Sequence, residues 1–216
     1  MRILGIEEAG RGPVIGNLVM CGLLFREERL PELEAIKVKD SKLLTPSQRT
    51  RLFSKILGLV EEYKIIQLTP QEIDAAVTSE TSNLNWLEAQ KMADLINAFK
   101  PDKALIDCPS PNIPAFTAHL RKRLAYQPEL TVAHKADVKY PIVSAASIIA
   151  KVTRDREIAK LKQKLKIDFG SGYPADPLTQ KFLKEHAQDF PGIFRTSWAP
   201  YRKVLLEKKQ RSLDAF

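Results

Sequence analysis

Four acidic residues end or follow apolar runs that predict strands, and their types indicate metal-dependent chemistry: Glu7, Glu8, Asp107 and Asp137. In an open α/β sheet, ligands bind in the crevice at the strand ends. Clustered carboxylates repel one another and are costly to desolvate, so they are tolerated where a cation is bound. Carboxylate oxygens without a Cys/His set favour Mg²⁺ or Mn²⁺ over Zn²⁺. Two such ions can activate a water and stabilise the leaving oxygen of a phosphodiester.

Glu7 and Glu8 are adjacent, which limits how they can share a site. Neighbouring side chains of a regular strand point to opposite faces of its sheet. We therefore expect the strand to end or bend here, and the sequence AGRG at residues 9–12 supplies such a break. For Asp107 or Asp137 taken alone, the alternative is an acid that simply faces solvent.

A glycine-rich turn, GRGP at residues 10–13, follows the first two acids. Its glycines allow the backbone to approach a ligand closely, and we expect that ligand to be a nucleic-acid strand. The turn links two apolar runs, 2–8 and 14–25, which predict a pair of antiparallel strands.

Further elements follow from periodicity and from helix start signals. Strands are expected over 64–69, 103–107 and 130–134. Helices are expected over 45–63, 70–77, 84–99, 112–125, 143–166, 177–188 and 199–212. Thr45 can cap the first of these helices, and Pro46 suits its first turn. Two antiparallel strands followed by alternating helices and strands predict an α/β fold, a mixed sheet with helices on its faces.

The charge of the chain is concentrated in its last third. The net charge is +8, and residues 151–216 hold 15 Lys and Arg against 8 Asp and Glu. A one-sided basic excess is typical of proteins with polyanionic partners. The alternative is a basic helical surface with no such partner.

Composition excludes other classes of protein. The 216 residues are 44% apolar, which is typical of a globular domain. No apolar run approaches the ~18 residues of a membrane span, and the first ten residues lack the pattern of a secretory signal. Cys21 and Cys108 have no CxxC spacing and are expected to be free thiols. We expect a cytoplasmic protein with no membrane partner.

Five longer stretches resemble the ribonuclease HII family, the type 2 ribonucleases H. In chain order they are GIEEAGRGPVIG at 5–16, DSKLLTPSQR at 40–49, ALIDCPS at 104–110, KADVKYPIVSAASIIAKVTRDRE at 135–157 and GSGYPADP at 170–177. The likeness extends from residue 3 to about residue 198. It is greatest to the archaeal, monomeric branch of the family.

The resemblance implies an RNase H-like fold, a mixed five-stranded sheet flanked by helices. Residues 1–175 would form the catalytic domain and residues 176–216 a C-terminal helical segment. It implies a metal-dependent endoribonuclease that hydrolyses RNA in RNA/DNA hybrids. It also implies cleavage 5′ of single ribonucleotides embedded in duplex DNA, leaving a 3′-hydroxyl and a 5′-phosphate.

The resemblance also implies roles for individual residues. The family's acids fall on Glu7, Glu8, Asp107 and Asp137, with two divalent ions, Mg²⁺ or Mn²⁺, bound together with substrate. The turn that reads the ribose 2′-hydroxyl matches Gly10, Arg11 and Gly12, and Tyr173 matches the tyrosine that packs on the neighbouring sugar. The turn and the tyrosine both suit an enzyme that distinguishes RNA from DNA, because only RNA carries the 2′-hydroxyl.

Phosphate contacts are expected from two segments. Ser41 and Lys42 match family residues near backbone phosphates, with a solvated loop lysine as the alternative for Lys42. Ser147 and Lys151 on the small-residue helix could act in the same way, with helix packing as the alternative for Ser147.

One departure from the family pattern concerns the first acid, which is Glu7 where the family has aspartate. The extra methylene displaces the carboxylate by roughly a bond length, and a misplacement near 1 Å can cost ~100-fold in rate. A compensating shift, reduced activity or an altered metal preference could follow. Because Mn²⁺ tolerates looser geometry than Mg²⁺, a preference for Mn²⁺ is one hypothesis.

The last residues, KKQRSLDAF, have the spacing of a sliding-clamp-binding peptide. Gln210, Leu213 and Phe216 would bind a hydrophobic pocket of the clamp. The usual second aromatic residue is missing, and a frayed basic tail is the alternative.

Other residues were considered for binding roles. Trp198, Tyr201 and Arg202 could clamp duplex DNA, although Trp198 is expected to pack the last helix onto the core. The three histidines do not cluster in sequence, and His134 is expected to be a strand residue rather than a metal ligand.

Two other functions compete with a catalytic ribonuclease. One is a nucleic-acid-binding relative whose catalysis is weakened by Glu7. The other is a different polynucleotidyl-transfer enzyme on the same fold, such as a Holliday-junction resolvase or a transposase-like nuclease. The Gly-Arg-Gly turn and Tyr173 argue against the latter, because both suit reading of a 2′-hydroxyl.

Overall fold

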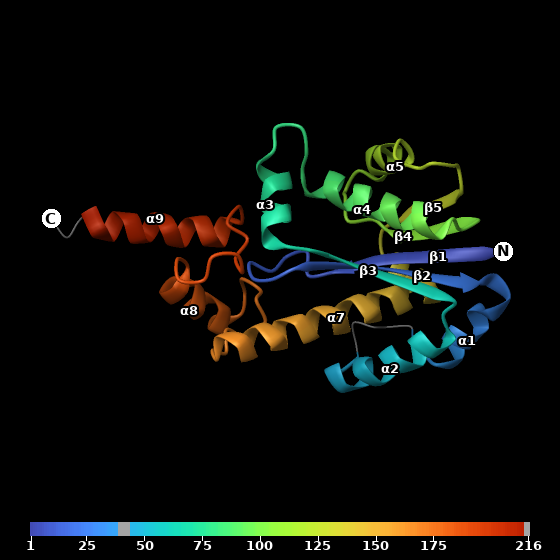
Figure 1. The fold of residues 1–216 in the computed structure, drawn as a ribbon, viewed down its shortest axis with the longest axis horizontal. Coiled ribbons are helices and arrows are strands. Elements are labelled where there is room, and N and C mark those ends of the chain that lie inside the picture. Colours follow the sequence, from blue (N-terminus) through green and yellow to red (C-terminus); the bar gives the residue numbers. More distant parts are fainter. Residues whose placement is uncertain (39–43, 214–216) are drawn as a thin grey trace. The chain divides into compact units, whose positions relative to one another are not determined.

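The computed structural model describes residues 1–38 and 44–213, with side chains described up to residue 210. Its strands are β1 (Arg2–Ala9), β2 (Leu18–Arg26), β3 (Glu62–Leu68), β4 (Lys103–Asp107) and β5 (Glu129–Ala133). Its helices are η1 (Glu27–Arg29), α1 (Leu30–Ala35), α2 (Pro46–Leu59), α3 (Pro70–Thr78), α4 (Leu84–Phe99), α5 (Ile113–Arg121), α6 (Ala136–Lys139), α7 (Pro141–Leu165), α8 (Pro177–His186) and α9 (Ala199–Leu213). Figure 1 shows their arrangement.

The five strands form one mixed sheet in the order β3-β2-β1-β4-β5. β1 pairs antiparallel with β2, from Arg2↔Arg26 to Ala9↔Val19, which confirms the predicted pair. On its other side β1 pairs parallel with β4, and β4 pairs parallel with β5. The predicted α/β fold with a mixed five-stranded sheet is therefore confirmed.

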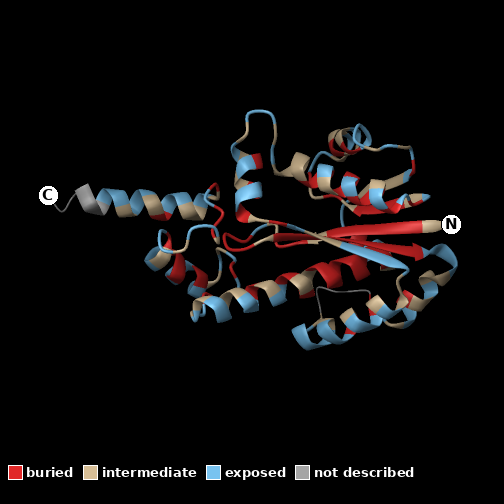
Figure 2. Ribbon diagram, viewed as in Figure 1, coloured by how far each residue is buried: buried red, intermediate tan, exposed pale blue. Residues whose placement is uncertain are grey.

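The sheet is covered on both faces. One face of β1 and β2 packs on the first half of α7 and on α1 and α2, in a core that includes Ile3, Cys21 and Ile149. On the opposite face Gly22 lies against Phe99 of α4, so closely that an added Cβ would stand 3.2 Å from its ring. The central strands are accordingly buried on both faces, as Figure 2 shows in red.

Helix α2 begins as its sequence predicts. The Thr45 hydroxyl accepts a hydrogen bond from the Gln48 backbone N–H, and the Gln48 side chain accepts one from the Thr45 N–H. This reciprocal pair satisfies two N–H groups that the first helical turn leaves without partners. Pro46 occupies the first turn, where its missing N–H costs nothing.

Several local predictions differ from the structure. The second strand begins at Leu18 rather than at residue 14, because the Val14 N–H donates instead to the Gly172 carbonyl. Helices α2 and α5 end at Leu59 and Arg121, each four residues before its predicted end. Helices α1 and α6 were not predicted; they have six and four residues, too few for a periodic apolar pattern to register.

The contacts divide the chain into two compact units. The first comprises Met1–Ala9, Val19–Gln67 and Leu84–Thr153, and contains the sheet. The second comprises Gly10–Leu18, Leu68–Asn83 and Arg154–Phe216. The units follow contacts rather than chain order, so they do not test the predicted division of the chain after residue 175.

Candidate active site

Three of the four predicted acids lie close together in the first unit. Glu7 lies on β1, and Asp107 is the last residue of the parallel strand β4. The β1–β4 register runs to Ile6↔Ile106, so Glu7 and Asp107 are the next residues on neighbouring strands. Their carboxylates therefore lie at the carboxyl edge of the sheet, where α/β proteins bind ligands.

Asp137 reaches the same edge through a sharp turn after β5. Lys135 adopts a left-handed conformation with φ of 56°, and α6 begins directly after it. The Ala136 N–H donates to Asp107 Oδ1 over 2.6 Å. This hydrogen bond fixes the start of α6, and with it Asp137, beside the end of β4.

Burial and like charges shape the ionisation of Glu7, whose side chain is only 7% exposed. Its pKa is raised from 4.5 to about 8, first by burial and then by the carboxylate of Asp107. Lys151 lowers this pKa, Asp137 raises it further, and Ser147 lowers it. Glu7 therefore lies within electrostatic reach of two other acids and of one lysine.

The donor atoms around Glu7 are suited to bind a divalent cation. Glu7 Oε2 is buried and has no hydrogen-bond partner among the described residues. A buried, partnerless carboxylate oxygen is costly unless a proton or a cation compensates it. An all-oxygen donor set of this kind suits Mg²⁺ or Mn²⁺.

The acids have not closed into a ligand cage. Across residues 1–38 and 44–213, no group of three or more His, Cys, Asp or Glu stands in metal-binding proximity.

Glu8 differs from the other three acids. The ladder between β1 and β2 continues without a break through Glu7↔Cys21, Glu8↔Met20 and Ala9↔Val19. β1 ends at Ala9, within the predicted break at residues 9–12, but it does not bend at Glu8, and strand alternation directs Glu8 to the side of the sheet opposite Glu7. Its charge raises the pKa of the Cys108 thiol, after the larger effects of burial and Asp107. A role for Glu8 beside Glu7 stays a prediction.

Ser147 and Lys151 lie on the half of α7 that covers the sheet. Ser147 is fully buried, and both residues influence the pKa of Glu7. The helix is made of small residues here, so that its backbone can approach the sheet closely, as at Gly5, where an added Cβ would stand 2.8 Å from the Ile142 backbone. Contacts of the two residues with phosphate stay predictions, and Ser41 and Lys42 lie outside the described residues.

The predicted nucleotide-reading turn lies in the second unit. Gly10 has a φ of 83°, and an added Cβ would stand 2.7 Å from Arg154 Cδ. Gly12 is exposed, and an added Cβ there would stand 3.6 Å from the Tyr173 ring. The structure thus places Gly12 beside Tyr173, which is itself 39% exposed.

Two buried arginines that sequence reasoning missed support this turn. Arg154 donates from Nη2 to the Ser171 carbonyl over 2.7 Å, and its guanidinium lies 4.9 Å from the centre of the Tyr173 ring. Burial lowers the pKa of Arg154. Arg195 is fully buried and donates to backbone carbonyls of the turn. Neither arginine belongs to a motif with a defined spacing. For Arg195 the sequence offers one signal of burial, because it is the charged residue in the otherwise uncharged stretch GIFRTSW.

The remaining candidates have structural partners. Trp198 is partly buried against the apolar cluster that includes Val204 of α9, in agreement with its predicted packing role, and its ring centre lies 5.1 Å from the Arg195 guanidinium. His134 lies in the turn just after β5 rather than in the strand, and its Nε2 is 2.8 Å from the Ser110 carbonyl. Gln210 is exposed on α9; the side chain of Leu213 and the whole of Phe216 lie outside the described residues.

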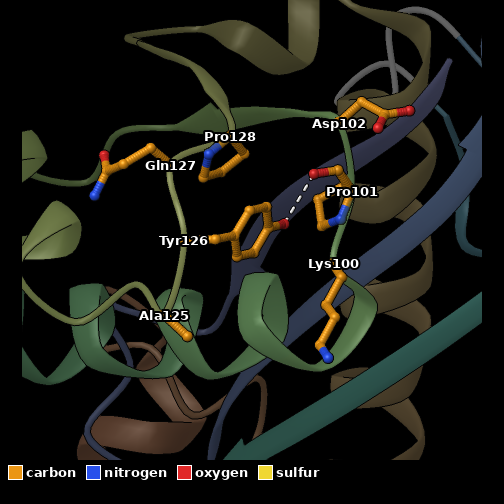
Figure 3. A pocket seen from close by; sticks show the side chains of 7 residues that line it. All are labelled: Lys100, Pro101, Asp102, Ala125, Tyr126, Gln127 and Pro128. Carbon is orange, nitrogen blue, oxygen red and sulfur yellow. Dashed lines mark hydrogen bonds between the residues drawn. The ribbon is translucent and has the colours of Figure 1, made fainter.

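A hollow of about 520 Å³ in the first unit is separate from the acids (Figure 3). It lies beside the start of β4 and before β5, at the amino ends of these strands. Its wall includes Tyr126, whose hydroxyl donates to the Pro101 carbonyl over 2.8 Å. Among the described residues that line the hollow, Asp102 is the one acid, so the hollow lacks the cluster of carboxylates expected of a metal site.

The family model of ribonuclease HII matches residues 4–201. The chain belongs to the ribonuclease HII family. A ribonuclease HII of Pyrococcus horikoshii is 45% identical over all of this chain and 99% of its own length. The crystal structure of the ribonuclease H2 from that organism has a TM-score of 0.88, over 97% of this chain and 99% of that one. As a member of this family, the chain is a type 2 ribonuclease H, an enzyme that depends on divalent metal ions.

A second solved relative was crystallised with a partner. The ribonuclease HII of Archaeoglobus fulgidus, 36% identical with a TM-score of 0.83, was solved in complex with PCNA. The match covers 92% of this chain and 95% of that one. In the part of the chain that the structure describes, none of the helices has the length and apolar character needed to span a membrane.

Proposed function

We propose that this ribonuclease H hydrolyses RNA in RNA/DNA hybrids and also cuts 5′ of single ribonucleotides embedded in duplex DNA. The products would carry a 3′-hydroxyl and a 5′-phosphate. Two divalent ions, Mg²⁺ or Mn²⁺, would be held by Glu7, Glu8, Asp107 and Asp137.

The observation that carries the proposal is the environment of Glu7. Its carboxylate is buried next to two further acids, with one oxygen that no described residue hydrogen-bonds. Such an arrangement destabilises the metal-free protein and is therefore better explained by a cation than by packing. Bound divalent ions would supply an activated water and stabilise charge on the leaving oxygen.

The surrounding residues would orient and regulate this centre. Asp107 Oδ1 accepts a hydrogen bond from the Ala136 N–H, which fixes the orientation of this carboxylate at the end of β4. Lys151 keeps Glu7 more acidic than burial alone would, which favours the ionised carboxylate that metal binding requires. Ser147 also lowers the pKa of Glu7.

Recognition of the ribose would come from the second unit. Gly12 lies next to the Tyr173 ring and carries no side chain. A ribose bound here would pack against the ring and hydrogen-bond to the backbone of the turn. Arg154 supports the ring from behind through its cation–π contact. Selection for a 2′-hydroxyl at this point would distinguish RNA from DNA.

The test is incision of a DNA duplex that carries one ribonucleotide, with Mg²⁺ and with Mn²⁺, by this chain and by Glu7→Asp. We expect incision 5′ of the ribonucleotide by both proteins. Because aspartate shortens the side chain, Glu7→Asp should raise the Mg²⁺-supported rate relative to the Mn²⁺-supported rate, by up to ~100-fold.

Three results would revise the proposal. A clear preference of the unaltered chain for Mg²⁺ would contradict the Mn²⁺ hypothesis. Cleavage by Glu7→Asp alone would identify a binding protein whose catalysis Glu7 weakens. Incision by neither protein, with folding intact, would overturn the proposed substrate.

A further inference from the structure

Arg195 is a fully buried arginine whose guanidinium donates to several backbone carbonyls. Its Nη2 donates to the Gly10 carbonyl over 2.6 Å, and its Nη1 donates to the Arg11 carbonyl over 2.8 Å. Its Nε and Nη2 both donate to the Gly16 carbonyl, over 3.0 and 2.9 Å. A planar guanidinium with several fixed donors is suited to bind three carbonyls at once.

These hydrogen bonds fix the orientation of two successive peptide planes. All peptide bonds in the described chain are trans. In a trans peptide the C=O and the following N–H point in opposite directions. Since the carbonyls of Gly10 and Arg11 point toward Arg195, the N–H groups of Arg11 and Gly12 must point away from it.

The outward side of this turn is the side that a ligand can reach. Gly12 is exposed, whereas Arg195 and Gly10 are buried. The turn is also tied at its other end, where the Gly16 N–H donates to the Ile193 carbonyl over 2.9 Å. Arg195 lies two residues after Ile193, so one segment holds the loop through both side chain and backbone.

We infer that Arg195 is the positioning residue of the ribose-reading turn, because it holds two consecutive backbone N–H groups toward the 2′-hydroxyl. Arg195 itself does not touch the substrate; it acts through the Gly10 and Arg11 carbonyls. The inference deepens the proposed function and rests on it.

The test compares Arg195→Lys with a matched control. Lysine keeps the positive charge but has one compact ammonium, which cannot reach the three carbonyls that the guanidinium binds. Phe190→Leu is the control, because Phe190 belongs to the same unit and stacks on Phe182, with a ring-centre distance of 5.7 Å. It should lower stability without a direct effect on the turn.

The first readout is amide hydrogen exchange, which needs no substrate. Faster exchange is expected in Arg195→Lys at Val14, Ile15 and Gly16, whose N–H groups are hydrogen-bonded in the loop. Phe190→Leu should leave these amides unchanged. Unchanged exchange in Arg195→Lys would overturn the role of Arg195, whatever the activity of the chain.

The second readout is binding without cleavage, with Ca²⁺ in place of Mg²⁺. The ratio of affinities for a ribonucleotide-containing duplex and an all-DNA duplex should fall about tenfold in Arg195→Lys, the loss expected for one hydrogen bond. A purely structural role would lower both affinities equally and leave the ratio unchanged, which would overturn the inference. Failure of the unaltered chain to incise its substrate would overturn the proposed function separately.

Discussion

At the scale of single residues, Glu7 occupies the proposed metal-binding position, and burial of its carboxylate costs free energy. Its carboxyl is buried among acids, and its pKa is raised to about 8, mainly by burial and by Asp107. Residue types and strand ends were enough to predict Glu7, Asp107 and Asp137 as candidates. The side on which Glu8 lies could not be predicted from the sequence, because a strand that ends at Ala9 can place Glu8 either by regular alternation or by a turn of the backbone.

The Glu7 pKa predicts how the stability of the metal-free protein depends on pH. Between pH 4.5 and about 8 the folded state retains a proton that the unfolded state has released. This contribution to stability is fully present below pH 4.5 and is lost as the pH rises through about 8. The loss is on the order of 5 kcal/mol.

Denaturant unfolding in EDTA, at about pH 5 and about pH 8.5, measures this effect. We expect Glu7→Gln to lose most of the pH dependence, because the amide cannot ionise. The same difference in stability between the two pH values in both proteins would contradict the assignment. Adding Mg²⁺ should restore stability more at the higher pH, where the ligand is ionised.

At the scale of elements, the Gly10–Gly16 loop shows how tertiary contacts decide local structure. Its apolar residues predicted a strand from residue 14, yet Val14 and Ile15 donate to the Gly172 carbonyl instead of pairing with β1. That partner is more than 150 residues away in sequence, so no local rule could find it. By contrast, α4 was predicted with its observed bounds, because sixteen residues give a full periodic pattern.

Gly10 offers a direct test of this loop. Gly10→Ala would place a Cβ in the left-handed region, 2.7 Å from Arg154 Cδ. We expect a loss of about 2 kcal/mol or more in the free energy of unfolding. We also expect a fall of roughly 100-fold in incision rate, because displacement of the turn misplaces the ribose.

Gly58→Ala is the matched control. Gly58 lies within α2, and an added Cβ would meet nothing within 4 Å. Alanine should therefore stabilise the protein by ~0.5–1 kcal/mol with no change in incision. Thermal unfolding measures the stability of both variants, and steady-state cleavage measures their incision rates. The same stability and the same incision rate in both variants would refute the steric argument for Gly10.

At the scale of the whole molecule, partner binding is predicted for the end of the chain. The Archaeoglobus relative was solved with PCNA, and this chain carries Gln210, Leu213 and Phe216 at clamp-peptide spacing. We propose that these residues bind a sliding clamp. Deleting the last seven residues should abolish clamp binding in a pull-down or by calorimetry, because it removes Gln210 and both apolar side chains.

Incision of a short ribonucleotide-containing duplex, measured without clamp, is the control for this deletion. We expect it to be unchanged, since none of the deleted residues belongs to the proposed metal site or ribose-reading turn. Clamp binding that survives the deletion would refute the proposal.

The order of the acids along the chain has a consequence for synthesis of the protein. Glu7 leaves the ribosome among the first residues, but its neighbours Asp107 and Asp137 follow 100 and 130 residues later. Strand β1 can pair with β2 early, whereas its pairing with β4 must wait. In the proposed metal site, a nascent chain that ends before Asp137 lacks one of the acids, so hydrolysis would begin only after the segment that follows β5 has been made.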